Sequence, residues 1–182
     1  MDSYEKSIKM LGNVSTVEGF WSYYNHMVRP NDSPNSSDYH IFKHGIKPMW
    51  EDEANKLGGK WIVRMRKGLA SRAWEELLFA LIGEQFDFGN DICGAVVSLR
   101  YQEGTTFVVV VVVVVVVVMN TRCEDIISVW NRDANDREGN LKTRDSLKQI
   151  LHFLPGFFPL EYKAHDASLK DNSSFRNTME LV

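Results

Sequence analysis

The chain has 182 residues, of which 44% are hydrophobic and 25% charged, with a formal net charge of −3. These values suit one globular domain and exclude a collagen-like, wholly disordered or multi-span membrane protein. A weakly acidic chain is also a poor candidate for coating long nucleic acid, although a small local nucleic-acid site stays open. With two cysteines, Cys93 and Cys123, and no signal-peptide pattern at its start, the chain is expected to be intracellular and without a disulfide scaffold.

The first half of the sequence predicts one helix, a short strand and two loops. A capping box from Ser15 to Glu18 begins the helix, whose apolar residues recur at helical spacing as far as Val28. The helix should end near Pro30, because proline cannot continue it. Residues 31–38 and 45–55 are rich in loop formers, and residues 40–43 between them indicate a short strand or turn.

Residues 60–67 predict a half-buried strand with a basic face. Trp61, Val63 and Met65 alternate with a second set formed by Lys60, Ile62, Arg64 and Arg66. For Arg64 and Arg66 we expect a solvated strand face.

The second half predicts two more helices and three more strands. Ser71 is expected to cap a helix that ends at Gly83, and Asn140 to cap another. Strands are expected at residues 92–101, 125–130 and 160–163, and the polar stretch 166–178 is expected to be mobile. This order, without a βαβ rhythm, favours an α+β fold in which helices cover one face of an antiparallel sheet.

Residues 108–118 are eleven consecutive valines. Such a run fixes no strand register, and it is shorter than the roughly 18 apolar residues that span a bilayer. Removing residues 104–124 would join two strand-like segments through a short polar link, which is a plausible hairpin. We therefore hypothesise that residues 1–182 form a single domain and that residues 104–124 are a low-complexity insertion within a β-hairpin.

Signatures of catalysis and metal binding are missing from the sequence. The phosphate-binding, nucleophile-elbow and zinc motifs are absent, and the five histidines have no ligand spacing. We therefore expect neither an enzyme nor a cofactor or metal. Of the five tryptophans, Trp50 is the one that a packed core explains least well, because it lies in a polar loop.

Several segments carry a resemblance to a known family. Residues 16–21, 45–61 and 93–97 resemble motifs of the eukaryotic translation initiation factor 4E family. Residues 72–77, 125–131 and 162–169 are similar to its class II members, called 4E homologous protein in animals and novel cap-binding protein in plants, and residues 171–178 resemble the plant form. The resemblance runs from about residue 3 to residue 178, apart from the valine segment.

This resemblance implies both a fold and a function. It implies a curved antiparallel sheet with three helices on its convex face, the 7-methylguanosine cap of messenger RNA bound on the concave face, and partner proteins bound on the helical face. The protein would be a monomeric, non-enzymatic regulator of translation in the cytoplasm and also in the nucleus. Because the chain starts near the family's first cap-site aromatic residue, the N-terminal edge strand of the family is expected to be missing.

By resemblance, four residues would hold the cap base. Tyr4 and Trp50 would stack on its two faces, because cation–π attraction favours the methylated, positively charged purine over guanine. Glu51 would accept hydrogen bonds from the guanine edge, and Trp130 would pack against the N7-methyl group. Alternative interpretations stay open for three of these residues. Tyr4 could be an aromatic residue of a frayed N-terminus, Glu51 could be one of three solvated acidic residues, and Trp130 could be a core residue.

The remaining implied contacts are to phosphates and to proteins. Lys60 and Arg100 match phosphate contacts of the family, and Lys170 is a further candidate, whereas Ile126 replaces a common lysine. A helix of the pattern Y-x-x-x-x-L-Φ, from factor 4G-like or 4E-binding proteins, would dock on Val17, Trp21, Glu76 and Gly83.

Two interpretations of the partner face remain open. Trp21 could equally be a core residue. Glu75 stands where class I members carry leucine, so binding to factor 4G is expected to be weak. A protein that binds partners but has lost cap affinity is the alternative function, and a product that does not fold is a third possibility.

Overall fold

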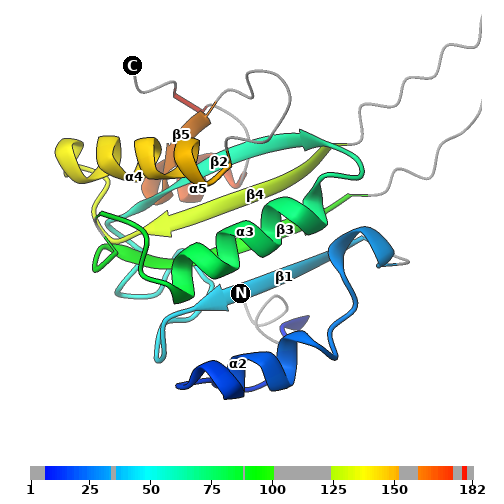
Figure 1. Cartoon of the computed structure of the whole chain (residues 1–182). Helices are drawn as coiled ribbons and strands as arrows, with labels where there is room; N and C mark the ends of the chain where they lie inside the picture. Colours follow the sequence, from blue (N-terminus) through cyan, green and yellow to red (C-terminus); the bar gives the residue numbers. More distant parts are fainter. Residues whose placement is uncertain are drawn as a thin grey trace, which may run out of the picture.

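The computed structural model describes residues 7–33, 36–87, 89–100, 124–151, 160–173 and 178–179. Five antiparallel strands form one curved sheet in the order β1-β3-β4-β2-β5 (Figure 1). The strands are β1 (Ser37–Phe42), β2 (Gly59–Arg66), β3 (Ile92–Leu99), β4 (Glu124–Asn131) and β5 (Leu160–Ala164). The helical segments are α2 (Val17–Tyr24), the 3₁₀ turn η1 (Pro30–Asp32), α3 (Ala70–Ile82), α4 (Arg137–Ile150) and α5 (His165–Asp171).

Helices α2, α3 and α4 belong to the convex side of the sheet. Figure 1 shows α3 running along the middle strands, with α4 above it and α2 below. The core between helices and sheet contains Trp61, Leu77 and Ile127, all fully buried. The predicted α+β fold with three helices on the convex face is thus confirmed.

Helix α5 is a fourth helix, and the sequence prediction missed it. Residues 166–178 were expected to be mobile, but 166–171 belong to α5. The helix packs on the opposite face of the sheet, where the ring centroid of His165 lies 4.3 Å from that of Trp130. Residues 174–177 lie outside the described residues.

Strand β2 is more deeply buried than the alternation of its residues predicts. Lys60 is 2% exposed and Ile62 is fully buried, and only Arg66 is exposed. The expectation of a half-buried strand was therefore wrong. The reason is that β2 lies between β4 and β5, with α5 packed against its second face.

Two helix starts differ from the predicted ones because neighbouring residues provide the caps. The Oγ1 atom of Thr16, rather than the hydroxyl of Ser15, accepts a hydrogen bond from the Gly19 amide at 3.0 Å. Asp136, not Asn140, caps α4 through the Gly139 amide at 3.0 Å.

The predicted role of Ser71 as a helix cap was also wrong. Ser71 lies within α3, which begins one residue earlier, and its hydroxyl accepts the amide of Asn31 at 2.9 Å. The predicted end of α3 is correct, because Gly83 is its C-cap residue and its amide donates to the Phe79 carbonyl at 2.8 Å.

Strands β3 and β4 pair as expected of a hairpin, with Ser98 opposite Ile126. Residues 101–123, which contain the valine run, lie outside the described residues, as does Tyr4. The insertion and the single domain therefore stay predictions. Among the described helices, none is both long and apolar enough to cross a membrane.

Candidate functional site

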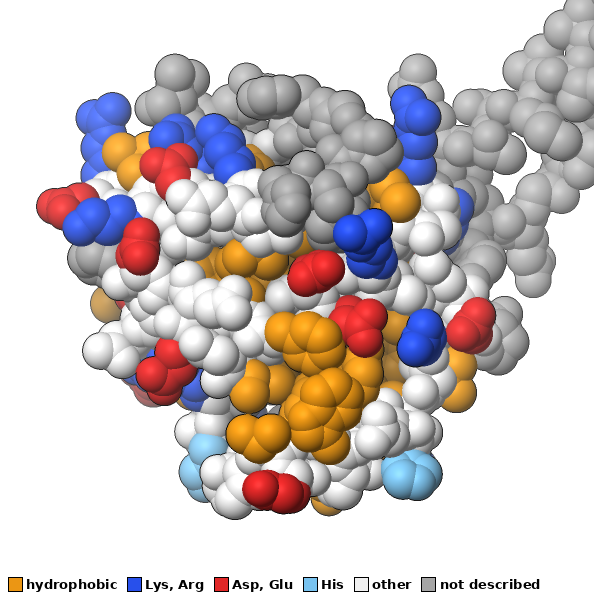
Figure 2. All heavy atoms as spheres, in the orientation of Figure 1, with side chains coloured by type: hydrophobic (Ala, Val, Ile, Leu, Met, Phe, Trp, Pro, Cys, Tyr) orange, Lys and Arg blue, Asp and Glu red, His pale blue; other side chains and the backbone are white. Residues whose placement is uncertain are grey.

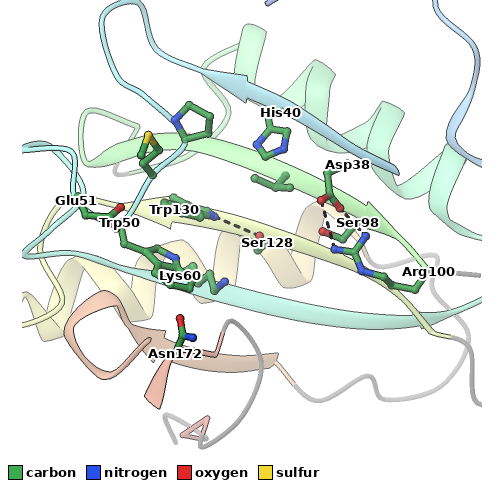
Figure 3. A pocket seen from close by; sticks show the side chains of 13 residues that line it. Asp38, His40, Trp50, Glu51, Lys60, Ser98, Arg100, Ser128, Trp130 and Asn172 are labelled. Carbon is green, nitrogen blue, oxygen red and sulfur yellow. Dashed lines mark hydrogen bonds and ion pairs between the residues drawn. The ribbon is translucent and has the colours of Figure 1, made fainter. Parts of the chain in front are cut away.

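The concave face carries a pocket of about 340 Å³, which we call the concave pocket. Residues from the loop after β1, from four strands and from the end of α5 line it (Figure 3). They are Asp38, His40, Pro48, Met49, Trp50, Glu51, Lys60, Val96, Ser98, Arg100, Ser128, Trp130 and Asn172.

Strand register arranges the side chains of this face in rows. Side chains two residues apart on a strand share a face, about 6.8 Å apart along it. The first row comprises Phe42, Gly94, Trp130, Lys60 and Lys163. The second row comprises His40, Val96, Ser128, Ile62 and Glu161, and the third comprises Asp38, Ser98, Ile126 and Arg64.

Trp50 lies in a loop whose conformation is fixed by hydrogen bonds from the loop's polar side chains. The fully buried Asn55 donates from its amide nitrogen to the carbonyls of Lys47 and Met49, both at 2.8 Å. The carboxylate of Asp52 accepts the amides of Lys47 at 3.0 Å and Ala54 at 2.9 Å. The Trp50 ring, half-buried, is thereby presented to the concave pocket without being part of the main core.

The end of this loop returns to the sheet through Gly58. A Cβ atom there would lie 1.8 Å from the Asn131 carbonyl oxygen, so the backbone can approach only without a side chain. The Gly59 amide then donates to Oδ1 of Asn131 at 3.0 Å, and Tyr162 donates to the same oxygen at 2.9 Å. This anchoring fixes the start of β2, and hence the position of Lys60.

Trp130 forms the aromatic floor of the pocket. Its Nε1 donates to the Ser128 hydroxyl at 3.3 Å, and Phe42 packs edge-on with ring centroids 5.4 Å apart. Gly94 lies between them in the row, and a Cβ there would lie 2.5 Å from the Phe42 ring. Burial lowers the pKa of the neighbouring His165 to about 3, so its ring packs on Trp130 in the neutral form.

Lys60 brings positive charge to the two tryptophans. Its Nζ lies 5.9 Å from the Trp50 ring centroid and 5.5 Å from the Trp130 ring centroid. Burial and the nearby charge of Lys163 lower the pKa of Lys60 to about 7, while Asp38 acts in the opposite direction. An anionic ligand would favour the charged form.

Arg100 lies at the far end of the concave pocket, where it pairs with Asp38 of β1. Its Nη1 donates to Oδ1 of Asp38 at 2.7 Å and its Nη2 to Oδ2 at 3.3 Å, as the dashed lines in Figure 3 show. The same Nη1 donates to the Leu99 carbonyl at 3.0 Å. These contacts hold the guanidinium beside the third row, where it can add a contact to an anion.

The structure brings five predicted residues to one pocket: Trp50, Glu51, Lys60, Arg100 and Trp130. Lys170 is not among the lining residues, since it is exposed and pairs with Asp166 within α5 at 3.0 Å. Sequence reasoning missed Asp38, His40, Ser98 and Ser128. Asp38 and His40 could have been found from their alternation with Phe42, which places the three on one face of a strand, but this strand was predicted to begin only at residue 40.

An apolar patch covers α2 and α3 on the convex side, and we call it the helix patch. It comprises Val17, Trp21, Phe79 and Ile82, which are between 36% and 59% exposed. Figure 2 shows hydrophobic side chains gathered over these two helices. The ring centroids of Trp21 and Phe79 lie 5.7 Å apart, so Trp21 packs on α3 while part of its ring stays open.

The two other predicted partner residues lie on α3. Glu76 is half-buried, with one carboxylate oxygen 4.0 Å from Nε of Arg72, and Gly83 is exposed at the end of the helix. Within the described residues, no group of three or more His, Cys, Asp or Glu side chains is placed to hold a metal ion.

Comparison with known proteins assigns this chain to a family. The sequence profile described as "Eukaryotic initiation factor 4E" matches residues 1–112 and 104–180. The chain therefore belongs to the eukaryotic initiation factor 4E family. Since this is a family of translation initiation factors and not of enzymes, the non-enzymatic expectation is confirmed.

Within the family, the chain is similar to the plant proteins named NCBP. It is 46% identical to "Eukaryotic translation initiation factor NCBP" of Triticum aestivum and 48% identical to that of Arabidopsis thaliana, each over 97% of its length. These matches cover 66% of the Triticum aestivum protein and 70% of the Arabidopsis thaliana protein. The chain is also 32% identical to human eukaryotic translation initiation factor 4E, a match that covers 96% of this chain and 73% of the human protein. The predicted class II resemblance is thus confirmed.

Solved structures of relatives share the fold. One is the Caenorhabditis elegans eIF4E-3 in complex with the 4E-binding protein Mextli and a cap analog, with a TM-score of 0.75, 38% identity, and coverage of 97% of this chain and 88% of that one. Another is the Ascaris suum eIF4E-3 with an m2,2,7G cap, with a TM-score of 0.74, 39% identity, and coverage of 90% and 81%.

Proposed function

We propose that this protein binds the 7-methylguanosine cap of messenger RNA in the concave pocket and modulates translation initiation through proteins docked on the helix patch. The observation that carries the proposal is one pocket with Trp50, Glu51 and Trp130 at one end, Lys60 beside the two tryptophans and Arg100 at the far end. This is a site for a cationic purine joined to an anionic chain. The fold of cap-bound relatives supports the same assignment.

Each end of the pocket has chemistry that suits one part of a cap. The Trp50 ring attracts a methylated, positively charged base by cation–π and stacking interactions, worth about 2 kcal/mol when water is excluded. The Glu51 carboxylate can accept two hydrogen bonds from the guanine edge. We propose Tyr4 as the second stacking ring, and Lys60, Arg100 and Lys170 as phosphate contacts.

The protein partner would be a short amphipathic helix lying on the helix patch, with Glu76 and Gly83 at its margin. Exposed aromatic residues that are already packed against their own chain are favourable anchors, because little side-chain entropy is lost on binding. The worm relative that binds the 4E-binding protein Mextli supports a 4E-binding protein as the partner class. We propose the cytoplasm, and also the nucleus, as places of action.

Retention on a 7-methylguanosine resin tests the proposal. We expect the wild-type protein to bind the resin and to be eluted by 7-methyl-GTP but not by GTP, because unmethylated guanine lacks the positive charge. Trp50→Ala should abolish retention, whereas Trp21→Ala, an equally large truncation outside the pocket, should preserve it. Equal elution by both nucleotides would refute cap recognition, and partner binding without retention would identify the cap-deficient alternative.

A further inference from the structure

A phosphate chain reaching from Trp50 toward Arg100 must cross the second row of the concave face. That row begins with His40 on β1, followed by Val96 and Ser128, and these three side chains line the concave pocket. Glu161 continues the row on β5, but it does not line the pocket and pairs with Arg64 at 3.2 Å. His40 is therefore the ionisable side chain of this row that faces the pocket.

The surroundings of His40 fix its protonation. Its Nδ1 is sealed from solvent and has no hydrogen-bond partner in the part of the chain that the structure describes. A proton on Nδ1 would be a buried donor without an acceptor, which is costly. Burial also lowers the pKa of His40, although Asp38 acts in the opposite direction. A neutral ring with its proton on Nε2, the nitrogen left for a ligand, avoids this buried donor.

We infer that His40 is a neutral hydrogen-bond donor, through Nε2–H, to the phosphate chain of a capped RNA. This inference rests on the proposed function, because it assigns a residue within the same pocket. Figure 3 shows His40 extending from β1 toward the pocket, with Trp130 on one side and the Asp38–Arg100 pair on the other. Lys60 and Arg100 provide charge at the two ends of this path, and His40 adds a directional donor between them.

Other charged or titratable groups face this region from every neighbouring element, so the pH dependence of binding does not by itself report on His40. They are Asp38 on β1, Glu51 on the loop, Lys60 on β2, Arg100 after β3 and His165 on α5. The test must therefore read His40 directly, and must separate the phosphate chain from the base.

Titration calorimetry with 7-methyl-GTP and with the 7-methylguanosine nucleoside separates the two. We expect His40→Leu to weaken 7-methyl-GTP about tenfold, the effect of one hydrogen bond to a charged group, and to change nucleoside binding less than about twofold. His40→Gln retains an N–H near the position of Nε2 and should recover most of the affinity, whereas His40→Asn should resemble His40→Leu. The matched control is His44→Leu, since His44 is exposed and outside the pocket lining.

Nuclear magnetic resonance of the imidazole nitrogens in the wild-type protein gives a readout that does not depend on any variant folding. We expect the neutral Nε2–H tautomer at pH 7 both before and after 7-methyl-GTP is added. An imidazolium in the complex, an unchanged 7-methyl-GTP affinity of His40→Leu, or equal losses for triphosphate and nucleoside would each overturn the inference. Failure of the wild-type protein to bind either ligand would overturn the proposed function itself, and this inference with it.

Discussion

Lys60 on β2 and Lys163 on β5 lie directly opposite each other in the sheet, and both side chains are buried. Nζ of Lys163 lies 2.6 Å from Oδ2 of Asp171 at the end of α5, so its charge is compensated there. The Nζ atom of Lys60 lies near the rings of Trp50 and Trp130. A pair of buried lysines in one row lowers the stability of the empty protein, and it would favour an anionic ligand in the concave pocket.

We expect Lys60→Met to stabilise the folded protein at pH 7. The pKa of Lys60 is about 7 in the folded state and 10.5 in its reference state, so between these values the unfolded chain binds more protons. The wild-type protein therefore loses stability at this site as pH falls from about 10 to 7. We expect the free energy of unfolding of the variant to be about 1–3 kcal/mol higher at pH 7, and the difference to shrink toward pH 10.

Calorimetric unfolding of both proteins at several pH values measures this difference, with the exposed Lys56→Met as the control. A variant that is less stable than the wild type at pH 7 would show that the Lys60 ammonium contributes more to the fold than its burial costs.

The predicted residues that the structure brings to the concave pocket belong to continuous local motifs. Trp50 and Glu51 lie in one loop whose turn formers and charges show that it is not a strand. Lys60 and Trp130 lie on strands in which successive side chains point to opposite faces of the sheet, so each of the two can lie on only one of two faces. Only the register, with Lys60 opposite Trp130, places them side by side, and register is a property of the assembled sheet.

The residues that sequence reasoning missed depend on contacts between distant segments. The polar stretch 166–178 indicated a mobile tail. Helix α5, which includes residues 166–171, is nevertheless anchored by the His165 amide, which donates to the Gly58 carbonyl at 2.9 Å, and by the Lys163–Asp171 pair. His40 was missed because its strand was predicted too short to show the alternation with Phe42, and its neighbours across the sheet are more than 50 residues away in sequence.

Trp21→Ala is expected to weaken protein partners while sparing the fold and cap binding. Trp21 is 39% exposed, whereas its neighbour Phe20 is buried in the main core. Removal of an aromatic anchor from an interface commonly costs about 2 kcal/mol or more of binding free energy. Fluorescence titration with a Y-x-x-x-x-L-Φ peptide measures the loss, and Phe20→Ala is the variant expected to reduce stability. If Trp21→Ala unfolds the chain, the core interpretation of Trp21 is correct.

Asn55→Ala is expected to disturb the pocket more than the fold. Its amide nitrogen joins the carbonyls of Lys47 and Met49, so the variant leaves two acceptors of the loop without this donor and lets Trp50 move. We expect affinity for 7-methyl-GTP to fall about thirtyfold, as for two lost hydrogen bonds of about 1 kcal/mol each. The exposed Asn25→Ala is the control. Unchanged affinity would mean that the loop is held by its other contacts.

Deletion of residues 104–123 is expected to preserve the sheet and to raise solubility. Glu124 should be retained, because it is the first residue of β4 and pairs with Arg66 of β2. Strands β3 and β4, which this segment joins, already pair as far as Ser98 opposite Ile126. A shorter connection between them closes a smaller loop, which costs less conformational entropy. An uncharged, proline-free valine run is prone to β-aggregation, and its removal should suppress aggregation on heating. Thermal unfolding with light scattering compares the two chains, and a deletion variant that fails to fold would show that the segment belongs to the domain.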